Sequence, residues 1–264
     1  MIKDRIKKGI FFIPTLLTMG NILCGFFAIA SAMQEQWLPA GIAIGIAFAL
    51  DGLDGRVARM TDTQTDFGFQ LDSLADVISF GVAPAILAYM KWLQSLERLG
   101  ILLAFLFVCG AAMRLARFNA YDVEDDSSGD YFNGLPTPAA AGAVVSIYFI
   151  EFKLSTGEFA LPEWVFDFYP LVMPVFLLVL SYLMLSNLKY PTFKNITWTD
   201  MHPTGILFPL LFLVIVSALF PFAVFVLFFL GYLLSGILHV GRLLRPLVPQ
   251  ELMSKDGAKK TTIE

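Results

Sequence analysis

Charged side chains are scarce in this chain. Asp, Glu, Lys and Arg make up 15% of its 264 residues, whereas soluble domains carry about 25%. Hydrophobic residues make up 57%, and the mean hydropathy is +0.72. This composition excludes an ordinary soluble domain and predicts an integral membrane protein. The sequence also lacks the basic face that a nucleic-acid-binding protein needs, so we expect no nucleic-acid partner.

Cysteine and histidine are equally scarce, with two of each. Cys24 and Cys109 lie within apolar segments, which is typical of packed small side chains, and they imply no disulfide framework. His202 and His239 are far in sequence from the acidic motif described below. The sequence therefore argues against a zinc site.

Apolar runs dominate the remainder of the chain. A membrane-spanning helix needs roughly 20 mainly apolar residues. Eight stretches qualify, namely 14–33, 38–60, 70–92, 99–119, 136–153, 170–187, 203–220 and 222–245. The break between the last two depends on Pro221 alone, so six or seven spans remain open. We expect one all-α transmembrane catalytic domain over residues 1–245, with a short interfacial helix at 3–12 that ends before Pro14, and a polar, disordered tail at 246–264.

The distribution of lysine and arginine predicts the orientation in the membrane. With the N-terminus in the cytoplasm, fifteen of the eighteen basic residues fall in inner segments. The other three, Lys91, Arg98 and Lys153, fall in outer segments. This asymmetry favours eight spans in a cell's inner (cytoplasmic) membrane, with both termini on the cytoplasmic side.

Four aspartates stand out in this apolar sequence, in DGLDGRVARM (51–60) and FGFQLDSLAD (67–76). Asp51 and Asp54 share one face of the second predicted helix, and Asp72 and Asp76 share one face of the third. A short polar turn joins the helices, so the two faces can meet at their cytoplasmic ends. Such close carboxylates repel unless they are partly protonated or bind cations. Oxygen ligands of this kind suit Mg²⁺, Mn²⁺ or Ca²⁺, and a pair of ions about 4 Å apart could clamp a phosphoryl group.

Small residues accompany the acids. Gly52, Gly55, Ala58 and Gly68 remove side-chain bulk beside them, which lets a large ligand approach the backbone. Arg59 lies one turn from the acids and can pair with a phosphate. A cation transporter could also use buried acids, but we would then expect them near the bilayer midplane or on broken helices. Their position toward the inner face favours an enzyme.

The spacing of these residues resembles the signature of the CDP-alcohol phosphotransferase family, D-x-x-D-G-x-x-A-R-x8-G-x3-D-x3-D. All eight fixed positions match, and they are Asp51, Asp54, Gly55, Ala58, Arg59, Gly68, Asp72 and Asp76. The resemblance implies that the four aspartates bind two divalent cations, Mg²⁺ or Mn²⁺, and that Asp76 accepts a proton from the attacking alcohol. It also implies a nucleotide site formed by Gly55, Ala58, Arg59 and Gly68 together with Asp51.

Further segments resemble the bacterial-type phosphatidylserine synthases of that family, among them PTLLTMGNILCGFFAI (14–29), SFGVAPA (79–85), RLARFN (114–119), FNGLPTPAAAG (132–142) and SNLKYPTFK (186–194). This likeness implies CDP-diacylglycerol and L-serine as substrates, membrane lipids as the surroundings, a six-helix core plus a C-terminal helix pair, and a homodimer. We expect Arg114, Arg117, Asn119 and Ser79 to bind serine. Lys189 and Lys194 could bind phosphates or anchor the chain. Synthases of phosphatidylglycerophosphate or phosphatidylinositol phosphate, and an ether-lipid donor, remain alternatives.

Overall fold

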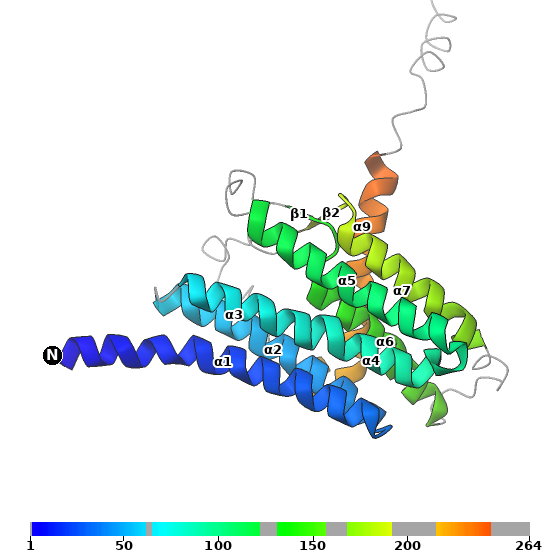
Figure 1. The fold of residues 1–264 in the computed structure, drawn as a ribbon, viewed down its shortest axis with the longest axis horizontal. Coiled ribbons are helices and arrows are strands. Elements are labelled where there is room, and N and C mark those ends of the chain that lie inside the picture. Colours follow the sequence, from blue (N-terminus) through cyan, green and yellow to red (C-terminus); the bar gives the residue numbers. More distant parts are fainter. Residues whose placement is uncertain (1, 62–64, 122–130, 157–167, 192–214, 244–264) are drawn as a thin grey trace, which may run out of the picture.

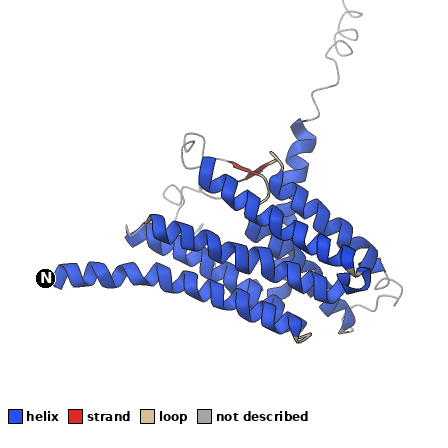
Figure 2. Cartoon of the chain, viewed as in Figure 1, coloured by secondary structure: helices blue, strands red, loops and turns tan. Residues whose placement is uncertain are grey.

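The chain folds as a bundle of long helices (Figures 1 and 2). The structure is a computed structural model, and it describes residues 2–61, 65–121, 131–156, 168–191 and 215–243. In chain order the elements are α1 (Ile2–Met33), α2 (Trp37–Thr61), α3 (Asp66–Asp76), η1 (Val77–Val82), α4 (Ala83–Ala88), η2 (Tyr89–Leu93), η3 (Gln94–Leu96), α5 (Arg98–Tyr121), β1 (Tyr131–Asn133), α6 (Thr137–Ser155), α7 (Tyr169–Leu185), β2 (Lys189–Pro191) and α9 (Pro221–Leu243).

Five helical stretches in the described residues are long and apolar enough to cross a membrane. They are Ile13–Met33, Trp37–Thr61, Asp66–Leu96, Arg98–Ala120 and Thr137–Ser155, and they confirm the first five predicted spans. Two shorter apolar helices, Tyr169–Leu185 and Pro221–Gly236, correspond to the predictions at 170–187 and 222–245. Most of the predicted span at 203–220, and the tail at 246–264, lie outside the described residues. The protein is therefore a multi-pass, all-α membrane protein.

The prediction of a separate interfacial helix at 3–12 is wrong. Helix α1 is continuous from Ile2 to Met33 and contains Pro14 in its interior. A proline removes one backbone donor, but its fixed φ angle is compatible with a helix, and long membrane helices tolerate it. The hydroxyl of Thr18 donates to the carbonyl of Pro14 at 3.0 Å, in the turn that follows the proline.

The third span contains two π-helical segments. Helix α3 begins at its N-cap Thr65, whose hydroxyl accepts a hydrogen bond from the backbone N–H of Gly68 at 3.1 Å. The π-helix η1 begins at Val77, directly after Asp76, and η2 follows α4. Such π segments often accompany functional sites. The segment η1 changes which of the following side chains share a face with Asp76.

Small residues bring the helices close together at the centre of the bundle. Helix α6 is buried along most of its length, and the buried part is a run of its own alanine, glycine and valine residues. Such small residues are expected where membrane helices pack tightly. Helix α9 packs on α6, and a Cβ atom at Gly142 would overlap the ring of Phe229. This glycine therefore fixes how closely α9 approaches.

A short two-stranded antiparallel sheet of β1 and β2 lies at one end of the bundle, with Phe132 opposite Tyr190. Gly134 follows β1 with a φ of +81°, and its amide donates to the carbonyl of Leu188. At the opposite end of α6, Lys91 forms an ion pair with Glu151 at 3.1 Å. The indole N–H of Trp92 donates to the same carboxylate at 2.7 Å.

Candidate active site

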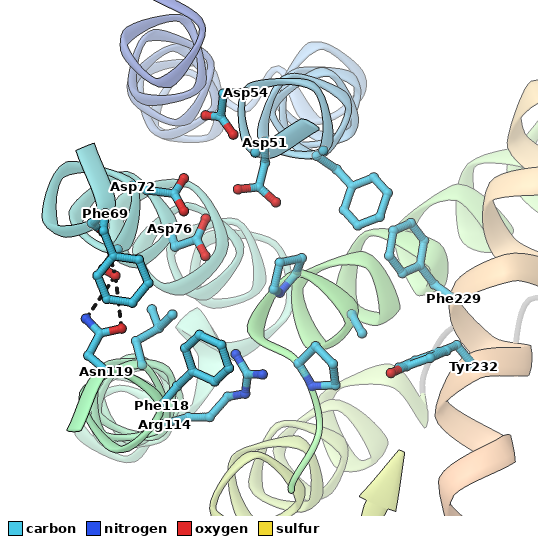
Figure 3. Close-up of a pocket in the computed structure, with 18 of the residues that line it drawn as sticks. Asp51, Asp54, Phe69, Asp72, Asp76, Arg114, Phe118, Asn119, Phe229 and Tyr232 are labelled. Carbon is cyan, nitrogen blue, oxygen red and sulfur yellow. Dashed lines mark hydrogen bonds between the residues drawn. The ribbon is translucent and has the colours of Figure 1, made fainter. Parts of the chain in front are cut away.

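Three of the predicted acids converge between α2 and α3 (Figure 3). Asp51, Asp72 and Asp76 each offer a carboxylate oxygen, and these oxygens all lie within 4.8 Å of one another. Helical spacing places Asp72 and Asp76 on one face of α3, and that face is turned toward Asp51 of α2. The convergence expected from the sequence is therefore observed for these three residues.

Asp54 lies one turn further along α2 and points toward α1 (Figure 3). Its side chain is 4% exposed. Its Oδ2 atom accepts a hydrogen bond at 2.9 Å from Thr18 Oγ1. Because Asp54 also lines the cavity described next, it remains available to a ligand on the side away from Thr18.

The acidic cluster fits a divalent cation in its donor chemistry. Oδ1 of Asp72 and Oδ1 of Asp76 are buried without a hydrogen-bond partner among the described residues. Buried carboxylate oxygens are costly to leave uncompensated, and a hard cation with oxygen ligands would satisfy them. The triad of Asp51, Asp72 and Asp76 could therefore bind metal ions.

The acids form one wall of a cavity of about 420 Å³, which we call the active-site cavity. Five helices contribute to it, and the lining residues come from two groups. On α2 and α3 they are Phe48, Asp51, Gly52, Asp54, Gly55, Arg59, Phe69, Asp72, Ser73 and Asp76; on α5, α6 and α9, with the residue before α6, they are Arg114, Leu115, Phe118, Asn119, Pro136, Pro138, Ala139, Phe228, Phe229 and Tyr232. The negative charge is thus confined to the α2 and α3 side.

A buried cation lies across the active-site cavity from α2. Arg114 of α5 is 7% exposed, and its guanidinium donates to Thr137 Oγ1 at 3.4 Å and lies over the ring of Phe118. Nearby, the amide of Asn119 donates to Ser73 Oγ at 3.0 Å, which joins α5 to α3 (Figure 3). The cavity therefore offers an anion-binding group facing a cation-binding group.

Comparison with known sequences decides the family. The profile of the CDP-alcohol phosphatidyltransferases matches residues 11–185, which is more than half of the chain. This protein belongs to the CDP-alcohol phosphatidyltransferase family. The matched region contains the four aspartates of the cavity and Arg114, and it ends where α7 ends.

Individual members of the family are also similar over most of their length. The chain is 38% identical to a CDP-diacylglycerol–serine O-phosphatidyltransferase of Helicobacter pylori strain 26695, over 72% of this chain and 76% of the relative. A protein of the same name from Bacillus subtilis strain 168 is 35% identical, over 70% and 92%. Another from Methanocaldococcus jannaschii is 35% identical, over 71% and 78%.

The other residues of the family signature divide into two groups in the structure. Gly55 and Arg59 line the active-site cavity beside the acids. Ala58 and Gly68 are not among its lining residues. Ala58 is half-buried on the helical face that carries Asp54, and Gly68 forms part of the N-terminal cap of α3. Gly68 thus contributes to the start of the helix that carries Asp72 and Asp76.

Two predicted acceptor residues lie elsewhere. Ser79 is fully buried and donates to the carbonyl of Asn21 of α1 at 2.9 Å, so it faces away from the active-site cavity. A regular α-helix would have put Ser79 on the face of Asp76, but η1 begins between them and changes the angular spacing. The predicted place of Ser79 in the cavity is wrong for this reason.

Arg117 is also absent from the residues that line the cavity. Its guanidinium donates to the carbonyls of Asn133, Leu185 and Ser186 and to the side chain of Asn187. These bonds join α5 to the residues before β2 and to the end of β1. The structure therefore gives Arg117 a role in holding the segments next to the two-stranded sheet, while Arg114 and Asn119 line the cavity.

Sequence reasoning missed several residues of the site. Thr18 is remote from the signature, and nothing in its local pattern shows that α1 packs against Asp54. Ser73 lies next to Asp72 in the sequence, and its bond to Asn119 depends on the approach of α5. Phe228, Phe229 and Tyr232 belong to an apolar helix whose orientation the sequence does not fix. The one available signal was the Tyr232 hydroxyl within that apolar run.

Proposed function

We propose that this protein transfers the phosphatidyl group of CDP-diacylglycerol to the hydroxyl of L-serine, which yields phosphatidylserine and CMP. The observation that carries the proposal is the carboxylate triad at the wall of a cavity, in a member of the CDP-alcohol phosphatidyltransferase family. The relatives from three organisms, which share the name CDP-diacylglycerol–serine O-phosphatidyltransferase, support the choice of substrates.

The donor side of the site lies on α2 and α3. We propose that Asp51, Asp54, Asp72 and Asp76 hold two Mg²⁺ or Mn²⁺ ions, which would neutralise the diphosphate and the departing CMP. Gly52 and Gly55 leave room for the nucleotide beside the acids. Arg59, at the same wall, can pair with a phosphate oxygen. Gly68 contributes instead to the N-terminal cap of α3, the helix that carries Asp72 and Asp76, and Ala58 lies on α2 between Gly55 and Arg59 outside the cavity lining.

The acceptor side lies on α5. Arg114 can bind the carboxylate of serine, because a buried guanidinium is matched in shape and charge to that group. The serine hydroxyl oxygen then attacks the phosphorus of the phosphatidyl group, the bond from that phosphorus to the oxygen of CMP breaks, and the hydroxyl proton passes to Asp76. A proton acceptor must lie within reach of the attacking hydroxyl. Of the labelled acids, Asp76 lies on the side of the cavity toward Arg114 of α5.

The positions of the basic residues support a cytoplasmic site. Arg59, Arg114 and Arg117 lie at the end of the bundle that contains the acids, whereas Lys91 and Lys153 lie at the other end. An excess of basic residues marks the cytoplasmic side. We therefore place the active-site cavity on the inner face of a cytoplasmic membrane, with eight spans, both termini inside and surrounding lipids as partners. Homodimerisation stays a prediction.

An acceptor assay tests this function directly. The purified protein in lipid nanodiscs is given CDP-diacylglycerol and Mg²⁺ or Mn²⁺, with radiolabelled serine, glycerol 3-phosphate or inositol phosphate offered separately. We expect label to enter lipid from serine, with release of one CMP per product. An ether-linked donor in a parallel reaction measures the preference for the lipid. Labelled lipid from one of the phosphorylated acceptors, and none from serine, would contradict the proposal.

A pair of variants on α3 links the activity to the acids. Asp72→Asn keeps the shape of the side chain but weakens cation binding, and we expect it to abolish CMP release. Asp66→Asn, in the exposed first turn of the same helix, serves as the matched control and should retain activity. Near-normal turnover by Asp72→Asn would remove the metal-assisted mechanism.

A further inference from the structure

Helix α9 forms part of the active-site cavity although it lies beyond the family match. The match ends at residue 185, whereas α9 begins at Pro221. Phe228, Phe229 and Tyr232 of α9 line the cavity. Figure 3 shows Phe229 and Tyr232 on the side opposite Asp72 and Asp76. The site is therefore completed by a segment that carries no part of the family signature.

The packing of α9 is specific at this point. The ring of Phe229 lies against Gly142 of α6 and contacts Phe48 of α2, with ring centroids 4.9 Å apart. One turn further, Tyr232 stacks on the buried Tyr190 of β2, with centroids 5.6 Å apart and an interplanar angle of 28°. These contacts determine the direction in which the Tyr232 phenol points.

The Tyr232 hydroxyl lies on the side of the active-site cavity that carries Arg114, opposite the acidic wall. Its ring enters the cavity from α9, and Figure 3 shows the oxygen at the end that faces the cavity and the Arg114 side. Tyr232 and Arg114 both line the active-site cavity. A phenol and a guanidinium together present several hydrogen-bond donors, and donors are what a carboxylate ligand requires.

We propose that Tyr232 is an acceptor-binding residue, whose hydroxyl donates a hydrogen bond to the amino-acid carboxylate that Arg114 holds. This inference rests on the proposed function. The acids that line the cavity all belong to α2 and α3, where a diphosphate with cations is expected. A second anionic group would be repelled from that wall, and the α5 and α9 side offers it donors. Tyr232 then distinguishes an amino-acid acceptor from a plain amino alcohol.

The test removes the hydroxyl and compares two acceptors. Tyr232→Phe keeps the ring and its stacking on Tyr190. Serine and ethanolamine both carry a hydroxyl and an ammonium group, but ethanolamine lacks the carboxylate. We expect the variant to raise the KM for serine about tenfold to a hundredfold, since hydrogen bonds to charged groups contribute about 1.5–3 kcal/mol. The KM for CDP-diacylglycerol and the activity with ethanolamine should not change.

Tyr190→Phe is the matched control. Tyr190 belongs to the same stacked pair, is fully buried and does not line the cavity. Its hydroxyl has no hydrogen-bond partner among the described residues. Burial raises the pKa of Tyr190 to about 12, so this phenol stays neutral at physiological pH. Loss of this hydroxyl should leave the KM for serine within twofold of the wild type.

A second variant tests rescue. Tyr232→His retains a ring with a hydrogen-bond donor and should recover part of the affinity for serine that Tyr232→Phe loses.

An unchanged KM for serine in Tyr232→Phe overturns the inference, and so does an equal loss of activity with both acceptors, which would indicate that Tyr232 only shapes the cavity. If the wild type transfers nothing to serine, the proposed function itself fails. The two failures are therefore distinguishable.

Discussion

The hydroxyl of Thr18 offers a way to test how Asp54 is held in place. Thr18 lies on α1 and is 5% exposed, and its Oγ1 atom reaches Asp54 Oδ2 at 2.9 Å and the carbonyl of Pro14 at 3.0 Å. A hydroxyl has one proton, so it donates to one of these acceptors at a time. Thr18→Val removes the donor and keeps the β-branched shape, which limits the change to the hydrogen bonds.

The size of the effect follows from the charge and burial of the acceptor. A hydrogen bond to a charged group contributes about 1.5–3 kcal/mol, and 1.4 kcal/mol corresponds to a factor of ten. Partners that orient a metal ligand typically alter metal affinity or activity by about 10–100-fold. Because Asp54 also lines the cavity, where water can replace part of the lost bond, we expect a change near the lower end, about tenfold.

The measurement is the concentration of Mg²⁺ or Mn²⁺ that gives half-maximal CMP release at saturating CDP-diacylglycerol and serine. We expect Thr18→Val to raise this concentration about tenfold, with a smaller effect on the KM for serine. Thr18→Ser keeps the hydroxyl and should behave like the wild type. If Thr18→Val shows an unchanged metal dependence, the hydroxyl serves the turn of α1 at Pro14, and the reasoning about Asp54 is refuted.

Two further predictions concern residues outside the active-site cavity. Arg117→Ala removes four hydrogen bonds next to the two-stranded sheet of β1 and β2. We expect the free energy of unfolding to fall by about 1–3 kcal/mol, seen as a lower thermal midpoint in nanodiscs, and the serine KM to stay close to that of the wild type. A large rise in that KM would restore Arg117 to the acceptor site. Glu151→Gln leaves the charge of Lys91 without its ion pair; we expect a loss of about 1–3 kcal/mol in stability with unchanged metal dependence, and an unaltered melting curve would show that this pair contributes nothing.

The aspartate cluster could be predicted because charge in an apolar helix carries positional information. An acid on such a helix must face a partner, a cation or water, and the spacing of Asp51, Asp72 and Asp76 leaves one face of each helix for it. Family resemblance added the identity of the ligand. The convergence of the acids of α2 and α3 then followed from the short connection between these helices. The structure agrees with this reasoning at the level of individual side chains.

The errors have specific causes. The prediction for Ser79 assumed a uniform helical repeat, and the π-helix η1 begins two residues before it. The prediction for Arg117 assumed that residues three apart on α5 share a target. Arg114 and Arg117 do lie near one another on the helix, but Arg117 donates to the carbonyls of Leu185 and Ser186, whereas Arg114 donates to Thr137. Such contacts depend on the position of a distant segment, which periodicity along one helix cannot supply.

The aromatic residues that α9 contributes to the cavity show most clearly what cannot be predicted from the sequence. An almost uniformly apolar helix can present any of its faces to the bundle, because lipid and protein are similarly apolar surroundings for it. Its orientation is set by complementarity of shape, here by Gly142 receiving Phe229 and Gly236 receiving Tyr190. Each of these glycines has a meaning only when paired with an aromatic residue far away in the sequence. The aspartates of the cavity can thus be recognised from their own spacing in the sequence, whereas the place of Tyr232 in the cavity follows only from the packing of α9 against α6 and β2.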